Sequence, residues 1–159
     1  MKQKQEFEKA VERLNQLKAD RETSPAELAG QLSAQREVVR ICAIRLSEAE
    51  HNAAMDQVTA LNTKAQEIRN RSAVLNREAD HFAKTAEGTL RGLYGEDGVN
   101  CLAGRNVRPL KFQELAVEAV NILGQADALE ASARSISASN AGGIAAAVSQ
   151  LLTAAQVEN

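Results

Sequence analysis

A seven-residue repeat of large and small residues runs through the middle of the chain and limits its possible folds more than any other feature. The large members are Leu61, Ile68, Leu75 and Phe82. Four residues after each stands a small one, at Ala65, Ser72, Ala79 and Ala86. This spacing places the side chains along one side of an α-helix, as in a coiled coil. We therefore predict a long helix over residues 50–93.

The same repeat returns later in the chain. Its large members are Leu115, Ile122, Leu129 and Ile136, and its small members are Ala119, Ala126 and Ala133. Two helices with matching repeats on either side of one connecting segment pack most simply as an antiparallel hairpin. Small residues let the two backbones approach closely, while the large residues fill the flanks. The expected fold is an all-α, elongated helical bundle built on this hairpin, with the second helix over residues 111–138.

Aromatic residues are scarce, which also favours helices. The chain has three Phe, one Tyr and no Trp among 159 residues. Aromatic side chains dominate the burial in most compact cores, so this core must consist of Leu, Ile, Val and Ala. Strand-favouring runs of Val, Ile, Thr and aromatics are absent. We expect a single helical domain over residues 1–159.

Shorter helices are predicted around the hairpin. Apolar residues on one helical face predict a helix over residues 3–20, and Ser24, Pro25 and Glu27 are typical of the start of a second, over 25–46. Ser47 and Glu50 resemble another capping box, so we expect a break near residues 47–52; one helix continuing through this point is the alternative. Poor helix formers at Asn140, Gly142 and Gly143 predict a kink before a last helix over 143–157.

Two isoleucines lie off the main apolar stripe of helix 25–46. Ile41 and Ile44 fall on nearly the opposite side of that helix from the stripe. A helix that is apolar on two sides is central in a bundle or contacts another chain. Ile41 and Ile44 are therefore the predicted oligomer interface, with a protein partner or a homodimer as the expected assembly.

The segment YGEDGVNCLAGRNVRPL, residues 94–110, is the predicted tip loop of the hairpin. Arg105 and Arg108 precede the next helix, where cations and backbone N–H groups can hold a small anion or a peptide carboxylate. The alternative is that they pair with carboxylates of the loop itself. The loop lacks both nucleotide-binding glycine patterns. The candidate contact residues are Tyr94, Asp97, Arg105 and Arg108.

This segment resembles one found in uncharacterised bacterial all-helical proteins. In those proteins a long helix ends in an aromatic–Gly–x–Asp turn that is followed by a glycine-rich stretch and an arginine. The matching residues here are Tyr94, Gly95, Asp97, Gly104, and Arg105 or Arg108. This chain departs from the pattern in having a single glycine at Gly104. The resemblance implies a helical hairpin with an ordered tip and implies no activity.

Two Glu-x-x-His pairs have the spacing used by di-iron helical bundles. They are Glu48 with His51 and Glu78 with His81. The pairs are 30 residues apart, which is about 45 Å along a continuous helix, so they cannot share a metal unless the chain reverses between them. We expect no metal and no cofactor, and a di-metal carboxylate protein is the third functional alternative.

The remaining features favour a non-enzymatic protein. Cys42 and Cys101 lack metal or disulfide spacing, and Cys101 has no neighbouring histidine that would serve as its base. The mixed charges of helix 50–93, which include Arg69 and Arg71, read as a solvated face. After Phe112 the chain has one cation among five acids.

These observations lead to one functional expectation. A net charge of −2 indicates no nucleic-acid partner. No signal peptide and no apolar run of about 20 residues is seen, so we expect a cytoplasmic protein without membrane contact. The predicted function is a helical interaction or scaffolding protein, with an anion- or carboxylate-binding tip as the alternative.

Overall fold

The computed structural model describes residues 2–20, 23–105 and 110–157, with backbone alone for residues 98–105. It contains α1 (Lys2–Ala19), α2 (Pro25–Arg105), α3 (Leu110–Ser139) and α4 (Gly143–Ala154). No strand occurs in these ranges, so the all-α prediction is confirmed. Two compact units are present: unit 1 comprises Met1–Val58 with Ser135–Asn159, and unit 2 comprises Thr59–Arg134.

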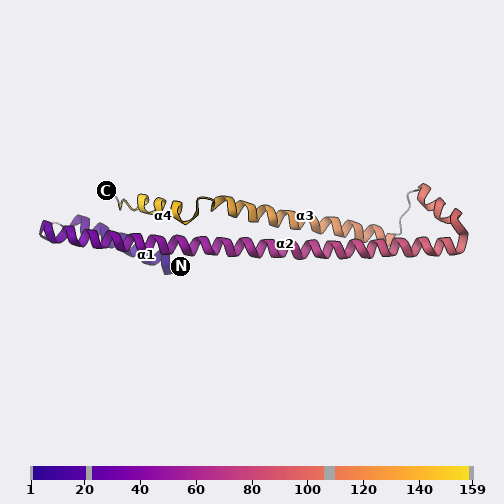
Figure 1. The fold of residues 1–159 in the computed structure, drawn as a ribbon, viewed down its shortest axis with the longest axis horizontal. Helices are drawn as coiled ribbons and strands as arrows, with labels where there is room; N and C mark the ends of the chain where they lie inside the picture. The colour runs from indigo at the N-terminus through magenta and orange to yellow at the C-terminus, as the bar shows by residue number, and fades with distance from the viewer. Residues whose placement is uncertain (1, 21–22, 106–109, 158–159) are drawn as a thin grey trace. The chain divides into compact units, whose positions relative to one another are not determined.

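Unit 1 is built where α1 folds back along the first part of α2 (Figure 1). Its buried core consists of Ala10 and Leu14 from α1, Val39 from α2, and Val157 beyond α4. Half-buried residues pack around this core, namely Phe7, Val11, Leu32, Cys42, Leu152 and Ala155. Gln35 Nε2 also donates a hydrogen bond of 2.9 Å to the Ala10 carbonyl. The predicted apolar face of α1 is therefore the face that joins it to α2.

A Schellman-type turn ends α4 and places Val157 in this core. The N–H of Val157 donates to the Leu152 carbonyl at 3.2 Å, and the N–H of Gln156 donates to the Thr153 carbonyl at 3.1 Å. Gln156 occupies the left-handed position of the motif, with φ of 50°. Lys18 Nζ donates to the Gln156 carbonyl at 2.7 Å. These bonds tie the turn to α1 and leave Val157 fully buried.

Unit 2 is the predicted antiparallel hairpin, formed by the later part of α2 and most of α3. The small members of the repeats are its most buried residues: Ala65, Ser72 and Ala79 of α2, and Ala119, Ala126 and Ala133 of α3. The Ser72 hydroxyl donates a 3.0 Å hydrogen bond to the Ala119 carbonyl. A serine side chain is short, so this bond requires the two backbones to lie very close. The small-residue contact is confirmed, and we call these six residues the alanine seam.

The large members of the repeats are less well covered. Leu61, Ile68 and Leu75 are half-buried, and Phe82 is 43% exposed. α1 belongs to unit 1, and within the described part of unit 2 only α2 and α3 contribute helices. The flank of the hairpin therefore keeps apolar surface open.

The predicted break near residues 47–52 is wrong. α2 runs without interruption from Pro25 to the kink at Gly95. No glycine or proline stands between Gly30 and Gly88, so nothing in this stretch disfavours helix strongly enough to end it. Ser47 is not an N-cap, because it lies inside α2 with only 1% of its surface exposed.

The predicted loop over residues 94–110 is also largely wrong. Gly95 alone departs from helical geometry, with φ of 64° and ψ of −159°, a conformation that glycine adopts without steric cost. Helix then resumes and continues to Arg105. A single glycine inside a helix costs about 1 kcal/mol, which is too little for Gly98 or Gly104 to replace the helix by a loop. Residues 106–109 lie outside the described ranges.

The predicted kink before the last helix is confirmed. Residues 140–142 form a turn, and Gly143 has φ of 63°. The side chain of Asn140 donates a 2.8 Å hydrogen bond to the Ile136 carbonyl, which closes the end of α3. A Cβ at Gly142 would stand 2.9 Å from that of Ala146. The turn therefore requires both glycines, one for its conformation and one for space.

Candidate functional site

The predicted tip residues are only partly within the described structure. Tyr94 is 67% exposed and Asp97 is exposed, on either side of the Gly95 kink. Arg105 is the last residue of α2, but its side chain lies outside the described part of the structure. All of Arg108 lies outside it. A ligand contact by these two arginines stays a prediction.

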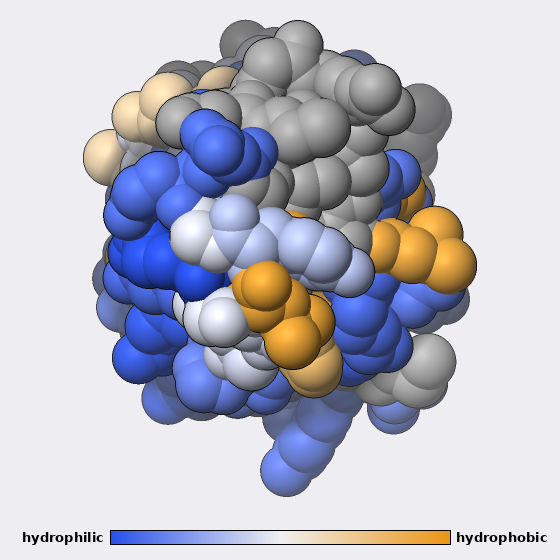
Figure 2. Space-filling model, turned by 90° about the vertical axis from the view of Figure 1, so that its right-hand side faces the viewer, coloured by the Kyte–Doolittle hydropathy of each residue, from blue (hydrophilic) through white to orange (hydrophobic). Residues whose placement is uncertain are grey.

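A cation that the sequence analysis did not single out spans the kink instead. Arg91 Nε lies 2.8 Å from Glu96 Oε1, and Arg91 Nη2 lies 3.2 Å from Glu87 Oε1. Glu87 precedes Gly95 and Glu96 follows it, so Arg91 links the two sides of the kink. Figure 2 shows a mainly hydrophilic face, on which apolar side chains form small separate patches.

The two Glu-x-x-His pairs do not assemble into a metal site. Glu48 and His51 belong to unit 1, whereas Glu78 and His81 belong to unit 2. Within the described ranges, no three His, Cys, Asp or Glu side chains gather closely enough to hold a metal ion. His81 is exposed, and its ring contacts Phe82 edge-on with 6.3 Å between the ring centroids. Among the described helices, none has a stretch long and apolar enough to cross a membrane.

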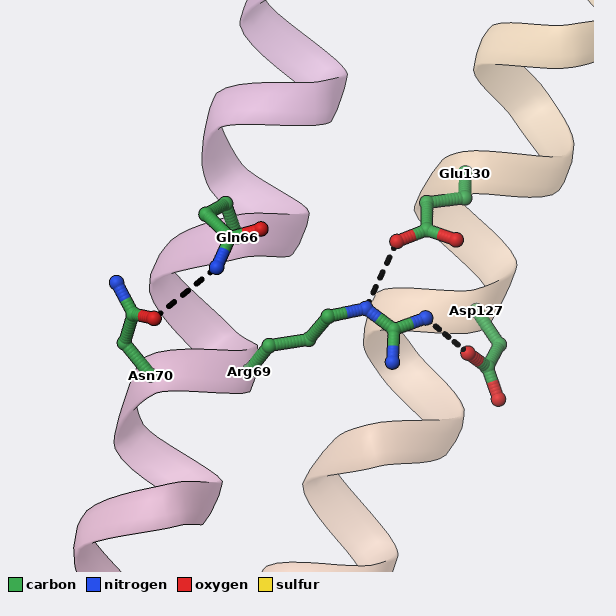
Figure 3. A network of polar contacts seen from close by, with 5 residues as sticks. All are labelled: Gln66, Arg69, Asn70, Asp127 and Glu130. Atoms are coloured by element: carbon green, nitrogen blue, oxygen red, sulfur yellow. Dashed lines mark hydrogen bonds and ion pairs between the residues drawn. The ribbon is translucent and has the colours of Figure 1, made fainter.

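In unit 2, Arg69 joins α2 to α3 (Figure 3). Its Nε donates to Glu130 Oε1 at 2.8 Å, and its Nη2 donates to Asp127 Oδ1 at 2.7 Å. Arg71 makes a second link, with 3.2 Å between its Nη2 and Glu118 Oε1. The two arginines therefore hold α3 at separate points along the alanine seam.

The contact between Arg69 and Glu130 shifts the pKa of both groups. The hydrogen bond from Arg69, followed by its charge, holds the pKa of Glu130 below its ordinary value. The hydrogen bond to Glu130 and its charge likewise raise the pKa of Arg69. The side chains of Arg69 and Arg71 are 37% and 69% exposed, in keeping with the predicted solvated face, but the prediction did not include their ion pairs with α3. The excess of acids after Phe112 was the signal that could have identified their partners.

Glu130→Gln is expected to reduce the sensitivity of the fold to acid. The pKa of Glu130 is lower in the folded chain than its unfolded value of about 4.3. Its ionised form therefore stabilises the fold above that pH, and the contribution is lost as the pH falls through the folded-state pKa. Urea unfolding at a series of pH values between about 7 and about 3 should show a smaller loss of stability for the variant than for the wild type.

Glu67→Gln is the matched control for this experiment. Glu67 is an exposed glutamate on the same hairpin and makes no ion pair within the described ranges, so its variant should keep the wild-type pH dependence. Identical slopes for the wild type and Glu130→Gln would show that the Arg69 contact contributes nothing to stability.

The predicted interface residues form an exposed apolar ridge on α2 in unit 1. Val38, Ile41 and Ile44 are 44%, 41% and 42% exposed. They follow one another at intervals of three residues, so they adjoin along the helix surface. At about 100° per residue, Ile41 and Ile44 lie on the side of α2 opposite the buried Val39. We call Val38, Ile41 and Ile44 the α2 ridge.

Unit 1 also contains an apolar groove that the sequence did not predict. It lies between α1 and α4 and has a volume of about 670 Å³. Its apolar walls include Phe7, Val11 and Leu151, and its polar lining residues are Glu8, Glu12, Asn15 and Gln16. We call it the α1–α4 groove. Its two walls are more than 130 residues apart in the sequence, and only the fold brings them together.

No protein family, no curated protein and no solved structure matches the chain. The resemblance of the tip segment to bacterial all-helical proteins therefore stays a prediction that rests on its own residues.

Proposed function

We propose that the protein is a non-enzymatic helical interaction or scaffolding protein that associates with a second copy of itself through the α2 ridge. The observation that carries this proposal is the exposure of Ile41 and Ile44 at 41% and 42%. Both are β-branched, so their side chains have little rotamer freedom to lose when they become buried in a contact. We place this activity in the cytoplasm, in keeping with two cysteines that lack disulfide spacing.

The arrangement of the ridge supports a contact rather than chance exposure. Single exposed apolar residues are common on protein surfaces, whereas contiguous apolar patches mark interaction sites. The three ridge residues occupy less than two turns of one helix, and the core of unit 1 already uses the other side of that helix through Val39. The ridge thus adds nothing to the folding of unit 1, and covering it would stabilise an assembly.

Ile41→Glu combined with Ile44→Glu is expected to convert an oligomeric wild type into a monomer. Two carboxylates on the ridge would have to be buried in the contact, and burying unpaired charges costs far more than such an interface gains. The folded chain should remain intact, because both side chains already face water. Light scattering coupled to size exclusion measures the mass of each protein.

The control is Val117→Glu combined with Val120→Glu. These valines are 59% and 67% exposed on α3 and have the same three-residue spacing. This variant should keep the wild-type mass. A wild type that is already monomeric, or an unchanged mass in the ridge variant, contradicts self-association through the ridge.

A further inference from the structure

We infer that the α2 ridge of one copy docks into the α1–α4 groove of another copy. This inference rests on the proposed function and adds to it the surface that receives the ridge. The ridge supplies three apolar side chains standing out from a helix, and the groove supplies an apolar cleft of about 670 Å³ between two helices. A helix packing its apolar side into a groove between helices is a recurring mode of protein recognition.

The charges around the two surfaces are complementary. The groove is lined by two acids, Glu8 and Glu12, and by no lysine or arginine. The ridge is bordered by two arginines, because Arg40 stands four residues before Ile44 and Arg45 four residues after Ile41.

The acids near the ridge form no strong ion pair with these arginines in the described part of the chain. Arg45 lines a pocket with Glu6 of α1 and with Glu48 but pairs with neither. Arg40 pairs with Glu37 at 3.6 Å, but both side chains of this pair are largely exposed, and exposed pairs of this kind are weak. Glu48 follows Ile44 by four residues and so lies at the end of the ridge. Docking would place Arg40 and Arg45 near Glu8 and Glu12, where opposite charges fix the orientation of the contact.

A ridge that occupies the groove belongs to a second copy, because a chain cannot place its own ridge in its own groove. Ile41 and Ile44 lie on the side of α2 opposite Val39, and Val39 is the residue through which α2 packs against α1 and Val157. The ridge therefore lies on the side of α2 away from this core, although Lys2, Gln3 and Glu6 at the start of α1 line a pocket together with Arg45 and Glu48. Contact between two different surfaces is heterologous, so each copy has one donor surface and one acceptor surface.

This division of surfaces makes a complementation experiment possible. Ile41→Glu with Ile44→Glu removes the ridge and leaves the groove intact. Glu12→Arg with Ala154→Arg places bulk and positive charge in the groove and leaves the ridge intact. Glu12 and Ala154 are both exposed, so the second variant should fold. Each variant alone is expected to be monomeric, and an equimolar mixture should form a 1:1 complex in sedimentation equilibrium.

Two further variants keep the test decisive. Glu8→Arg with Gln16→Arg alters other groove residues and should behave as the first groove variant does. Glu50→Arg with Gln150→Arg changes exposed residues of α2 and α4 that do not line the groove and should keep the wild-type mass. Circular dichroism checks that every variant retains its helix content.

The outcomes separate the two proposals. A monomeric wild type overturns both. A monomeric ridge variant together with groove variants of wild-type mass overturns the groove alone, and leaves self-association through the ridge standing. Monomeric single variants that form no complex when mixed show that the ridge of one copy does not bind the groove of another, and this result overturns the inference.

Discussion

Ala126→Leu is expected to lower the free energy of unfolding by about 3 kcal/mol, the upper end of the usual cost of overpacking. Ala126 is fully buried in the alanine seam, where α2 and α3 approach closely enough for Ser72 to reach the Ala119 carbonyl. A leucine side chain has no space there, so the two backbones must separate. Separation would also weaken the Ser72 hydrogen bond. Urea unfolding followed by circular dichroism measures the change.

Ala131→Leu is the control for this substitution. Ala131 is an exposed residue of the same helix, and leucine is nearly as good a helix former as alanine. Its effect on stability should stay within about 0.5 kcal/mol. Equal effects of the two substitutions would mean that the seam tolerates large residues, and the close approach of the two helices would then be disproved.

Leu14→Ala is expected to destabilise unit 1 by about 3 kcal/mol, within the range measured for leucine truncations in cores. Leu14 is fully buried in the cluster that joins α1 to Val39 and Val157. Truncation removes apolar contacts on all sides and leaves a cavity. Because α1 is held to α2 largely through this cluster, hydrogen exchange of the α1 amides should increase along with the loss of stability in urea.

Leu93→Ala serves as the comparison, since Leu93 is 68% exposed on α2. Its truncation should change stability by less than about 0.5 kcal/mol. If Leu14→Ala costs no more than Leu93→Ala, α1 is not packed as described.

The hairpin was the part of the fold most open to prediction, for a local reason. A repeat of seven residues can be recognised from a few neighbouring turns of one helix. Its small members, such as Ala119 and Ala126, indicate close packing before the partner helix is known. A second stretch with the same repeat then identifies that partner. The kink before α4 was predictable in the same way, because Asn140, Gly142 and Gly143 are poor helix formers as neighbours.

The errors came from local signals that the surrounding helix overrode. Ser47 and Glu50 look like the start of a helix, but a cap sequence has no effect where the preceding turns are already helical and nothing breaks them. The glycines of residues 95–104 suggested a loop, yet only Gly95 leaves the helical conformation.

The candidate site divides along similar lines. The position of Ile41 and Ile44 opposite the main apolar stripe followed from their angular spacing on one helix, whereas their exposure came from the structure. The α1–α4 groove and the pairing of Arg69 with Asp127 and Glu130 could not be predicted from the sequence, because each needs residues from helices far apart in the chain.

The sequence by itself determined that the chain is helical, where its alanine seam lies, and which face of α2 remains apolar. These properties depend on the spacing of apolar and small residues along one helix, and that spacing can be read directly from the sequence. Only the tertiary structure decided that α2 continues past Ser47, that Val157 enters the core of unit 1, and that α1 and α4 enclose a groove. Each of these depends on the free energy of contacts between distant segments, which no local pattern contains.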